Sequence, residues 1–392
     1  MHFPLLVWEQ RKLGDMANIL RGASPRPIKD KKWFDTNSRI GWIRISDVTS
    51  QNGRVYTLGQ HLSKKGQEKT RVVSSQTLLL SIAASVGYPV ITYVETGVHD
   101  GFVIFDKPKF NLDFMFFKLQ SIQNIWNKYG QAGSQVNINS SIVANTSISI
   151  PNIEEQKRIS ILLKKIEENI YLQQRKLEQL KLLKRMISLS IYPNFNDRIP
   201  IKFNLNSTWN KKKLKNITNY KNGTTHEQHQ LLKGKFELIN LNSISKEGRL
   251  KSSGKYINQQ FPTLRKNDIV MILSDIAHGQ LIGTSAVIPT NNKYILNQRV
   301  ASLSPNENLN AVFISKYINL KQRYFKKMAA GMSQINLSKK DVEDFKLWVP
   351  NFKEQTKIAN LLINFDLIEK NKNKKISYLL NLKKFLLQSL FL

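Results

Sequence analysis

The chain has 392 residues, and its 60 lysines and arginines exceed its 28 aspartates and glutamates by 32 charges. The length allows two or more domains with proper cores, and the charge points to nucleic acid or an acidic membrane surface as a partner. A lysine-rich solvated surface is the plainer explanation, although so large an imbalance costs self-repulsion. The sequence contains no cysteine, which excludes disulfide scaffolds, thiolate zinc sites and cysteine nucleophiles.

The first residues, 1–7, form an apolar stretch that is too short for a signal peptide and lacks its basic start. No stretch of the sequence approaches the roughly 20 apolar residues that cross a membrane. We therefore expect a cytoplasmic protein.

Residues 1–150 predict a mixed domain of strands and helices. Short apolar runs at 76–82 and 90–94 suit buried strands, and residues 114–128 carry aromatic and apolar side chains at helical spacing. Turn-rich loops separate these runs.

Residues 151–197 predict one long helix. Glu154 and Glu155 suit the positive end of its dipole, and Tyr192-Pro193-Asn194 ends it. A helix of about 37 residues would be roughly 55 Å long at 1.5 Å per residue. Its apolar residues follow a four-three spacing, broken by Gln173, that is typical of a coiled-coil seam. The seam residues are Ile159, Leu163, Ile166, Ile170, Leu177, Leu180 and Ile187.

Residues 198–350 predict a second mixed domain, with strands at 268–273 and 285–288 and a helix at 311–328. Residues 351–392 predict a second long helix, in which Glu369 and Lys372 interrupt the seam. Its seam residues are Ile358, Leu362, Phe365, Ile376, Leu379 and Leu386.

The two halves of the sequence are copies of one unit. Glu155-Gln156 and Glu354-Gln355 match at an offset of 199, which also relates Ser134-Gln135 to Ser333-Gln334. The offset is 201 at Trp8 and 196 at Ile43, so insertions and deletions fall in the front of each copy. A recurring offset over a domain and its helix indicates a tandem duplication.

The duplication predicts an α+β fold with two tandem mixed domains, each followed by a long helix. Two equal helices with apolar stripes can bury each other by pairing antiparallel, which places one domain at each end of a pseudo-twofold coiled coil. Ser134-Gln135 and Ser333-Gln334 either lock each domain onto its helix or contact a nucleic acid; we favour the lock.

No catalytic motif is present in the sequence. It has no phosphate-binding loop, no GxSxG elbow, no HExxH, no Gly-rich nucleotide fingerprint and no adenine-methyltransferase tetrapeptide. His226 and His229 have the spacing of a metal pair, but no further ligand lies nearby, which favours a surface loop. His99-Asp100 is half of an acid–base pair at most, because its counterpart is Asn297-Gln298. We expect neither a catalytic nor a metal site.

Loops that mix basic, amide and hydroxyl groups are the candidates for binding DNA, because Arg and Lys read guanine edges or phosphates and Asn and Gln read adenine. In the first domain they are Arg44, Ser46, Asp47 and Arg54, with Lys31, Lys32, Lys64, Lys65 and Arg71 for phosphates. In the second domain they are Asn240, Asn242, Lys246 and Arg249, with Lys255 and Arg265 for phosphates. Arg44 corresponds to Asn240 in the second copy, so the two domains should read different bases. The alternative is that these are solvated loop residues.

The doubled pattern resembles a specificity subunit of a type I restriction–modification system. The resemblance rests on Trp8-Glu-Gln-Arg-Lys-Leu13, Gly133-Ser-Gln-Val-Asn137 and Pro151-(x)3-Glu155-Gln156-(x)2-Ile159, with their counterparts at Trp209, Met332-Ser-Gln-Ile-Asn336 and Pro350-(x)3-Glu354-Gln355-(x)2-Ile358. It covers essentially the whole chain. The second copy departs from the first where Asn210-Lys211-Lys212 replaces Glu9-Gln10-Arg11.

The resemblance implies that each diverged domain reads one half of a split sequence in double-stranded DNA. It also implies that the helices set the gap, near one helical turn of about 34 Å. Two modification subunits carrying S-adenosylmethionine would dock on the helices and methylate adenine N6, flipping the base out. Restriction subunits would carry ATP and magnesium, and this chain would bind no cofactor. A stand-alone nucleic-acid-binding protein or a coiled-coil scaffold remains the alternative.

Overall fold

The computed structural model describes residues 8–83, 85–129, 138–192, 208–276, 279–331 and 334–391. The chain divides into unit 1, Met1–Arg175 with Lys374–Leu392, and unit 2, Lys176–Asn373, so each long helix contributes to both units. The segments 1–7 and 133–137, Pro193-Asn194 and Met332-Ser333, on which several predictions rest, lie outside the described residues.

Unit 1 is built around a five-stranded sheet. The strands of unit 1 as a whole are β1 (Glu9–Lys12), β2 (Asn18–Arg21), β3 (Gly41–Trp42), β4 (Arg54–Val55), β5 (Arg71–Val73), β6 (Thr77–Ser81), β7 (Pro89–Thr92), β8 (Thr96–Val98), β9 (Phe102–Asp106) and β10 (Ser147–Ile150). Its helices are α1 (Leu13–Met16), η1 (Lys31–Trp33), α2 (Ile45–Ser50), α3 (Lys64–Glu68), α4 (Leu112–Ser121), η2 (Gln123–Tyr129), α5 (Ser140–Asn145) and the start of α6 (Ile153–Ile191). The five-stranded sheet has the order β2-β9-β6-β7-β4, and a three-stranded sheet has the order β3-β8-β5.

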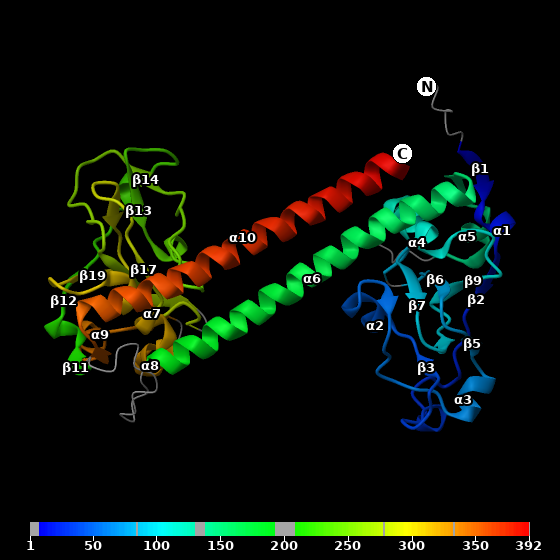
Figure 1. Ribbon diagram of the computed structural model, residues 1–392, viewed down its shortest axis with the longest axis horizontal. Helices are drawn as coiled ribbons and strands as arrows, with labels where there is room; N and C mark the ends of the chain where they lie inside the picture. Colours follow the sequence, from blue (N-terminus) through cyan, green and yellow to red (C-terminus); the bar gives the residue numbers. More distant parts are fainter. Residues whose placement is uncertain are drawn as a thin grey trace. The chain divides into compact units, whose positions relative to one another are not determined.

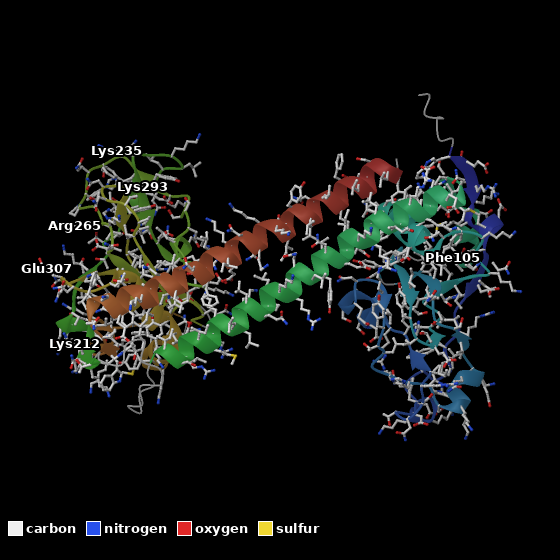
Figure 2. All side chains as sticks on the ribbon, viewed as in Figure 1. Phe105, Lys212, Lys235, Arg265, Lys293 and Glu307 are labelled. Carbon is white, nitrogen blue, oxygen red and sulfur yellow. The ribbon has the colours of Figure 1, made fainter. Side chains whose placement is uncertain are left out.

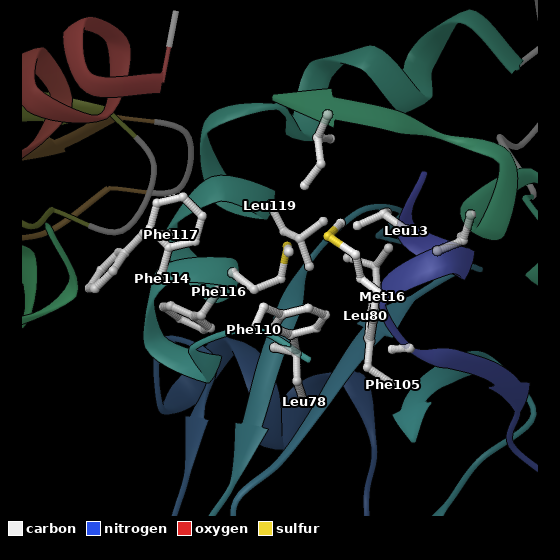
Figure 3. Packing of buried hydrophobic residues seen from close by; sticks show 14 of the residues in the cluster. Leu13, Met16, Leu78, Leu80, Phe105, Phe110, Phe114, Phe116, Phe117 and Leu119 are labelled. Atoms are coloured by element: carbon white, nitrogen blue, oxygen red, sulfur yellow. The ribbon is translucent and has the colours of Figure 1, made fainter. Parts of the chain in front are cut away.

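The core of unit 1 lies between this five-stranded sheet and α4. Phe114, Phe116 and Phe117 of α4 are fully buried in a cluster that includes Leu78 and Leu80 of β6 (Figure 3). The apolar run at 76–82 thus forms the buried strand that the sequence predicts, because both of its faces are covered.

Unit 2 repeats this arrangement. Its strands are β11 (Asn210–Lys213), β12 (Thr218–Asn222), β13 (Phe236–Ile239), β14 (Tyr256–Ile257), β15 (Ile269–Ile272), β16 (Ser274–Ile276), β17 (Ser285–Val287), β18 (Tyr294–Leu296), β19 (Val300–Pro305), β20 (Gln334–Asn336) and β21 (Lys346–Val349). Its helices are η3 (Leu214–Asn216), η4 (Glu227–His229), η5 (Leu241–Ser243), α7 (Ala311–Leu320), α8 (Gln322–Met328), α9 (Lys339–Glu343) and the start of α10 (Phe352–Phe391). The main sheet, β12-β19-β15-β17, has the order of β2-β9-β6-β7 in unit 1.

Two predicted helices are interrupted. The stretch 114–128 forms α4 and the 3-10 helix η2, and the stretch 311–328 forms α7 and α8. The apolar spacing does not reveal the breaks, because a helix with a short kink keeps nearly the same period of exposed and buried positions.

A buried glutamine joins each globular part to its long helix. The Gln156 amide oxygen accepts from the Asn111 backbone N–H at 2.9 Å, and its NH2 group donates to the Pro151 carbonyl at 2.8 Å. In unit 2, Gln355 makes the same two bonds, to Asn310 and Pro350, at 2.9 Å each. The repeated Glu-Gln pair is therefore a structural joint: its glutamine fixes the start of the long helix against the helix start that Asn111 or Asn310 caps.

The long helices lie antiparallel within each unit (Figure 1). In unit 1, Phe391 at the end of α10 belongs to the same buried cluster as Ile159 and Leu163 at the start of α6. In unit 2, Ile191 at the end of α6 belongs to the same buried cluster as Ile358 at the start of α10.

All thirteen predicted seam residues are buried or half-buried. The predicted α+β fold, with two domains each followed by a long helix, is confirmed. A continuous coiled coil remains a prediction. Among the described helices, none is long and apolar enough to cross a membrane.

Candidate nucleic-acid interface

The residues predicted to read bases begin a short helical turn in each unit. Arg44 precedes α2, and its backbone N–H donates to the Asp47 carboxylate at 2.9 Å. Asn240 precedes η5; its backbone N–H donates to Ser243, and its side-chain oxygen accepts from the Asn242 backbone at 2.8 Å. Asp47 and the Asn240 oxygen are thus helix caps. The predicted DNA-binding role of Asp47 loses support, because its carboxylate caps the turn, whereas Asn240 keeps its side-chain NH2 group as a donor.

A shallow cavity of about 310 Å³ lies at this turn in unit 1, lined by Arg44, Ser46, Asp47, Gly59 and Gln60. It brings together three predicted residues and adds Gln60, which the sequence analysis missed because it lies 16 positions after Arg44. The side-chain oxygen of Gln60 is buried without a hydrogen-bond partner. The exposed Arg44 guanidinium at this cavity can recognise the edge of a guanine.

Two arginines that the sequence analysis missed lie, like Arg44, near enough to His99 to lower its pKa. The Arg21 Nε donates to the Asp100 carbonyl at 3.0 Å, and Arg26 forms an ion pair with the Asp100 carboxylate at 2.6 Å. Burial lowers the pKa of His99, Asp100 opposes this, and the three arginines lower the pKa further.

The His99 ring is therefore neutral at pH 7. Its Nδ1 accepts from the Gly101 backbone N–H at 2.9 Å, so its 3.1 Å approach to Asp100 is not an ion pair. The arginines leave a net positive charge around this loop, which suits a phosphate better than acid–base chemistry.

The predicted phosphate-binding lysines of unit 1 gather where η1 packs against α3. Lys31, Lys32, Lys64 and Lys65 are all exposed, and the Ser63 hydroxyl that caps α3 donates to the Lys32 carbonyl at 2.6 Å. Lys32 also forms an ion pair with Asp30 at 2.9 Å, which makes it a weaker candidate for binding a phosphate. Arg71 is exposed on β5, where it pairs with Val98, the neighbour of His99.

The DNA-binding candidates of unit 2, Asn242 and Lys246 for bases and Lys255 and Arg265 for phosphates, are less uniform. Arg265, Asn242 and Lys246 are exposed, whereas Lys255 is half-buried. Figure 2 labels Arg265 together with Lys235 and Lys293, two exposed lysines that the sequence analysis missed. Strand pairing explains their proximity: the Glu237 backbone N–H donates to the Lys293 carbonyl at 3.0 Å, and Leu264 donates to Tyr294 at 2.8 Å.

Arg54 and Arg249 form ion pairs within their own units, which argues against their prediction as DNA-binding residues. The Arg54 side chain is only 12% exposed and is held by Asp113 and Glu167. Arg249 is held by Glu369 at 2.8 Å. A guanidinium whose donors face carboxylates of its own chain is poorly available to a phosphate or a base.

Of the histidine pair of unit 2, His229 is exposed as predicted for a surface loop, whereas His226 is part of the fold. His226 is buried against the ring of Phe261 at 4.4 Å, and its Nε2 lies 3.1 Å from the Thr224 hydroxyl. Burial lowers its pKa. Among the described residues, no three His, Cys, Asp or Glu side chains lie close enough to share a metal ion.

Two copies of one α+β unit, each with an exposed polar side chain (Arg44 or Asn242) at an equivalent turn and exposed basic residues elsewhere, have the arrangement expected of a tandem nucleic-acid-binding protein. The type I restriction modification DNA specificity domain matches residues 7–182 and again residues 206–378. Because these matches cover most of the sequence, the chain belongs to the family of type I restriction–modification DNA specificity proteins.

Solved structures share this fold. One is the S subunit of a type I restriction–modification system from M. genitalium, with a TM-score of 0.64 and 16% identity over 100% of this chain and 98% of that chain. Another comes from work on the complex assembly and conformational transition of the type I R-M system, with a TM-score of 0.62 and 15% identity over 100% of this chain and 99% of that chain.

Proposed function

We propose that this chain selects the DNA sequence on which a type I restriction–modification complex acts, with each unit reading one half of a bipartite site. The observation that carries the proposal is the equivalent turn in the two units. Arg44 and Ser46 stand there in unit 1, and Asn240 and Asn242 in unit 2. Arginine favours guanine and asparagine favours adenine, so the same fold presents different chemistry twice.

The long helices have a second task in this proposal, which is to dock two modification subunits. Soluble proteins rarely expose many large apolar side chains on one element without a partner. On α6 they are Ile153, Ile161, Leu162, Tyr171, Leu172, Leu182, Leu183, Met186 and Leu189. On α10 they are Phe352, Ile363, Leu367, Ile368, Tyr378, Leu380 and Phe385.

The chemistry belongs to those partners in this proposal. Modification subunits would bind S-adenosylmethionine and methylate adenine N6, and restriction subunits would use ATP and magnesium. This chain would bind no cofactor and catalyse no step. The helices would set the gap between the half-sites.

Single substitutions test the division of labour between the units. The chain is co-expressed with a cognate adenine methyltransferase, and N6-methyladenine is mapped on the host DNA. Arg44→Ala should relax one half of the motif and leave the other unchanged, and Asn240→Ala should do the reverse. Each lost base contact should cost about 1–3 kcal/mol of discrimination, or roughly 5- to 150-fold. If both variants altered both halves alike, the division would be wrong.

A further inference from the structure

A Gly-Arg pair recurs behind the base-reading turn of each unit. Gly53-Arg54 and Gly248-Arg249 match at an offset of 195, and both glycines have positive φ, +80° and +70°. The arginines follow Arg44 and Asn240 by ten and nine residues. In each unit, one short segment therefore begins with the candidate base-reading residue and ends with an arginine.

In unit 1, the Arg54 guanidinium lies in a pocket of complementary groups. Its Nε donates to Glu167 of α6 at 2.8 Å, and its Nη1 donates to Asp113 of α4 at 2.6 Å. Its carbon lies 4.6 Å from the centre of the Phe116 ring. Glu167 also accepts from Lys383 of α10 at 2.7 Å. One carboxylate thus holds the segment and both long helices together.

Unit 2 builds the same connection from different residues. The Arg249 Nη2 donates to Glu369 of α10 at 2.8 Å and lies 3.7 Å from Asp366. Asp366 accepts from Lys184 of α6 at 2.5 Å. The offset of 199 relates Lys184 to Lys383 and Asp366 to Glu167, so the two connections occupy equivalent places in the duplication.

We propose that Arg54 and Arg249 are positioning residues that anchor the base-reading segment of each unit to its long helices. The inference rests on the proposed function and deepens it. The anchor holds the turn at residue 44 or 240 in one orientation on the helices that carry the modification subunits. Base reading then stays in register with the enzyme that acts on the site.

The ion pairs of the two arginines are better suited to fixing the orientation of the base-reading segment than to stabilising the fold. A buried ion pair costs desolvation, and a well-packed apolar residue often stabilises a fold as well. A planar guanidinium, however, fixes the direction of its carboxylate partners, which an apolar side chain does not. The duplication has kept arginine at both positions while the base-reading residues differ.

The test replaces the anchoring arginine of unit 2, Arg249, and leaves unit 1 unchanged. Arg249→Met keeps the length of the side chain and removes its charge. Arg323→Met, at an exposed position on α8 of the same unit, is the matched control because it loses the same charge. Arg249→Lys is the second variant, because an ammonium keeps the charge but not the planar fork. Each chain is assembled with a cognate adenine methyltransferase, and two quantities are measured: the methylated motif and the hydrogen exchange of residues 240–250.

Arg249→Met should lower discrimination in one half of the motif by about tenfold or more, as for a lost base contact, and speed hydrogen exchange in residues 240–250. The other half should be unchanged, Arg249→Lys should lie between, and Arg323→Met should match the wild type. Full discrimination in Arg249→Met or Arg249→Lys, or an equal loss in both halves, would overturn the anchor. If the wild-type complex gave no split motif, the proposed function would fail, and unchanged hydrogen exchange in Arg249→Met would separately overturn the anchor.

Discussion

Single buried side chains join each globular part to its long helix. Gln156 and Gln355 are only 4% and 1% exposed, and each satisfies one backbone donor and one backbone acceptor. The sequence showed that Glu-Gln recurs, but not that its glutamine is a joint. The partner of Gln156, Asn111, lies 45 positions earlier in the chain.

Replacing this glutamine should destabilise the unit that contains it. Gln355→Leu leaves the Asn310 N–H without its acceptor and should lower the free energy of unfolding by about 1–3 kcal/mol. Gln179→Leu, at an exposed position on α6, is the matched control and should change little. Urea unfolding measures both variants; equal values for the two would show that the joint contributes nothing.

The ionised carboxylate of Asp366 should stabilise the fold in a pH-dependent way. Burial would raise the pKa of this carboxyl, but Lys316 and Lys184 outweigh burial and hold the pKa below its ordinary value. Because the folded pKa is depressed, the stabilisation is complete above the unfolded value and is lost as pH falls through the folded pKa.

The melting temperature of wild type and Asp366→Asn should therefore differ most near neutral pH. The difference should shrink below about pH 4, where the unfolded carboxyl begins to protonate. A difference that stayed constant from pH 7 to pH 3 would contradict a role for the ionised carboxylate.

At the scale of elements, the continuous apolar runs were the most predictable features. The runs at 76–82 and 268–273 form β6 and β15, because both faces of these strands are buried. The turn before Arg54 was less informative. Asn52-Gly53 is typical of a turn, but a single sequence does not show that Glu167, 113 positions from Arg54, binds that arginine.

In unit 2, the corresponding glycine before Arg249 should resist substitution. At Gly248, φ is +70°, and an added Cβ would lie 2.1 Å from the Asn319 side-chain nitrogen and 2.8 Å from the Ser285 carbonyl. Gly254 has nearly the same φ, +68°, but nothing within 4 Å of an added Cβ. Both alanine variants carry the backbone cost of a positive φ, and only Gly248→Ala adds a clash.

We expect Gly248→Ala to lower the midpoint of thermal unfolding clearly more than Gly254→Ala. Differential scanning of the two proteins at equal concentration makes the comparison. Equal midpoints would mean that the turn before Arg249 is free to move away from Asn319.

At the scale of the whole molecule, the duplication was visible in the sequence, and the structure repeats it in sheet order, capped helices and joints. The bases that the chain recognises were not predictable. The front of each unit has diverged, and residue type alone did not separate Arg44, which lines a cavity, from Arg54, which is held by carboxylates.

The most direct test of the account maps N6-methyladenine on the DNA of cells that express this chain with a cognate adenine methyltransferase. We expect a split motif with one fixed gap. Exchanging residues 198–350 for those of another family member should then change one half of that motif and keep the other. No methylation from a soluble, assembled complex with a demonstrably active methyltransferase, or a change in both halves after the exchange, would contradict the account.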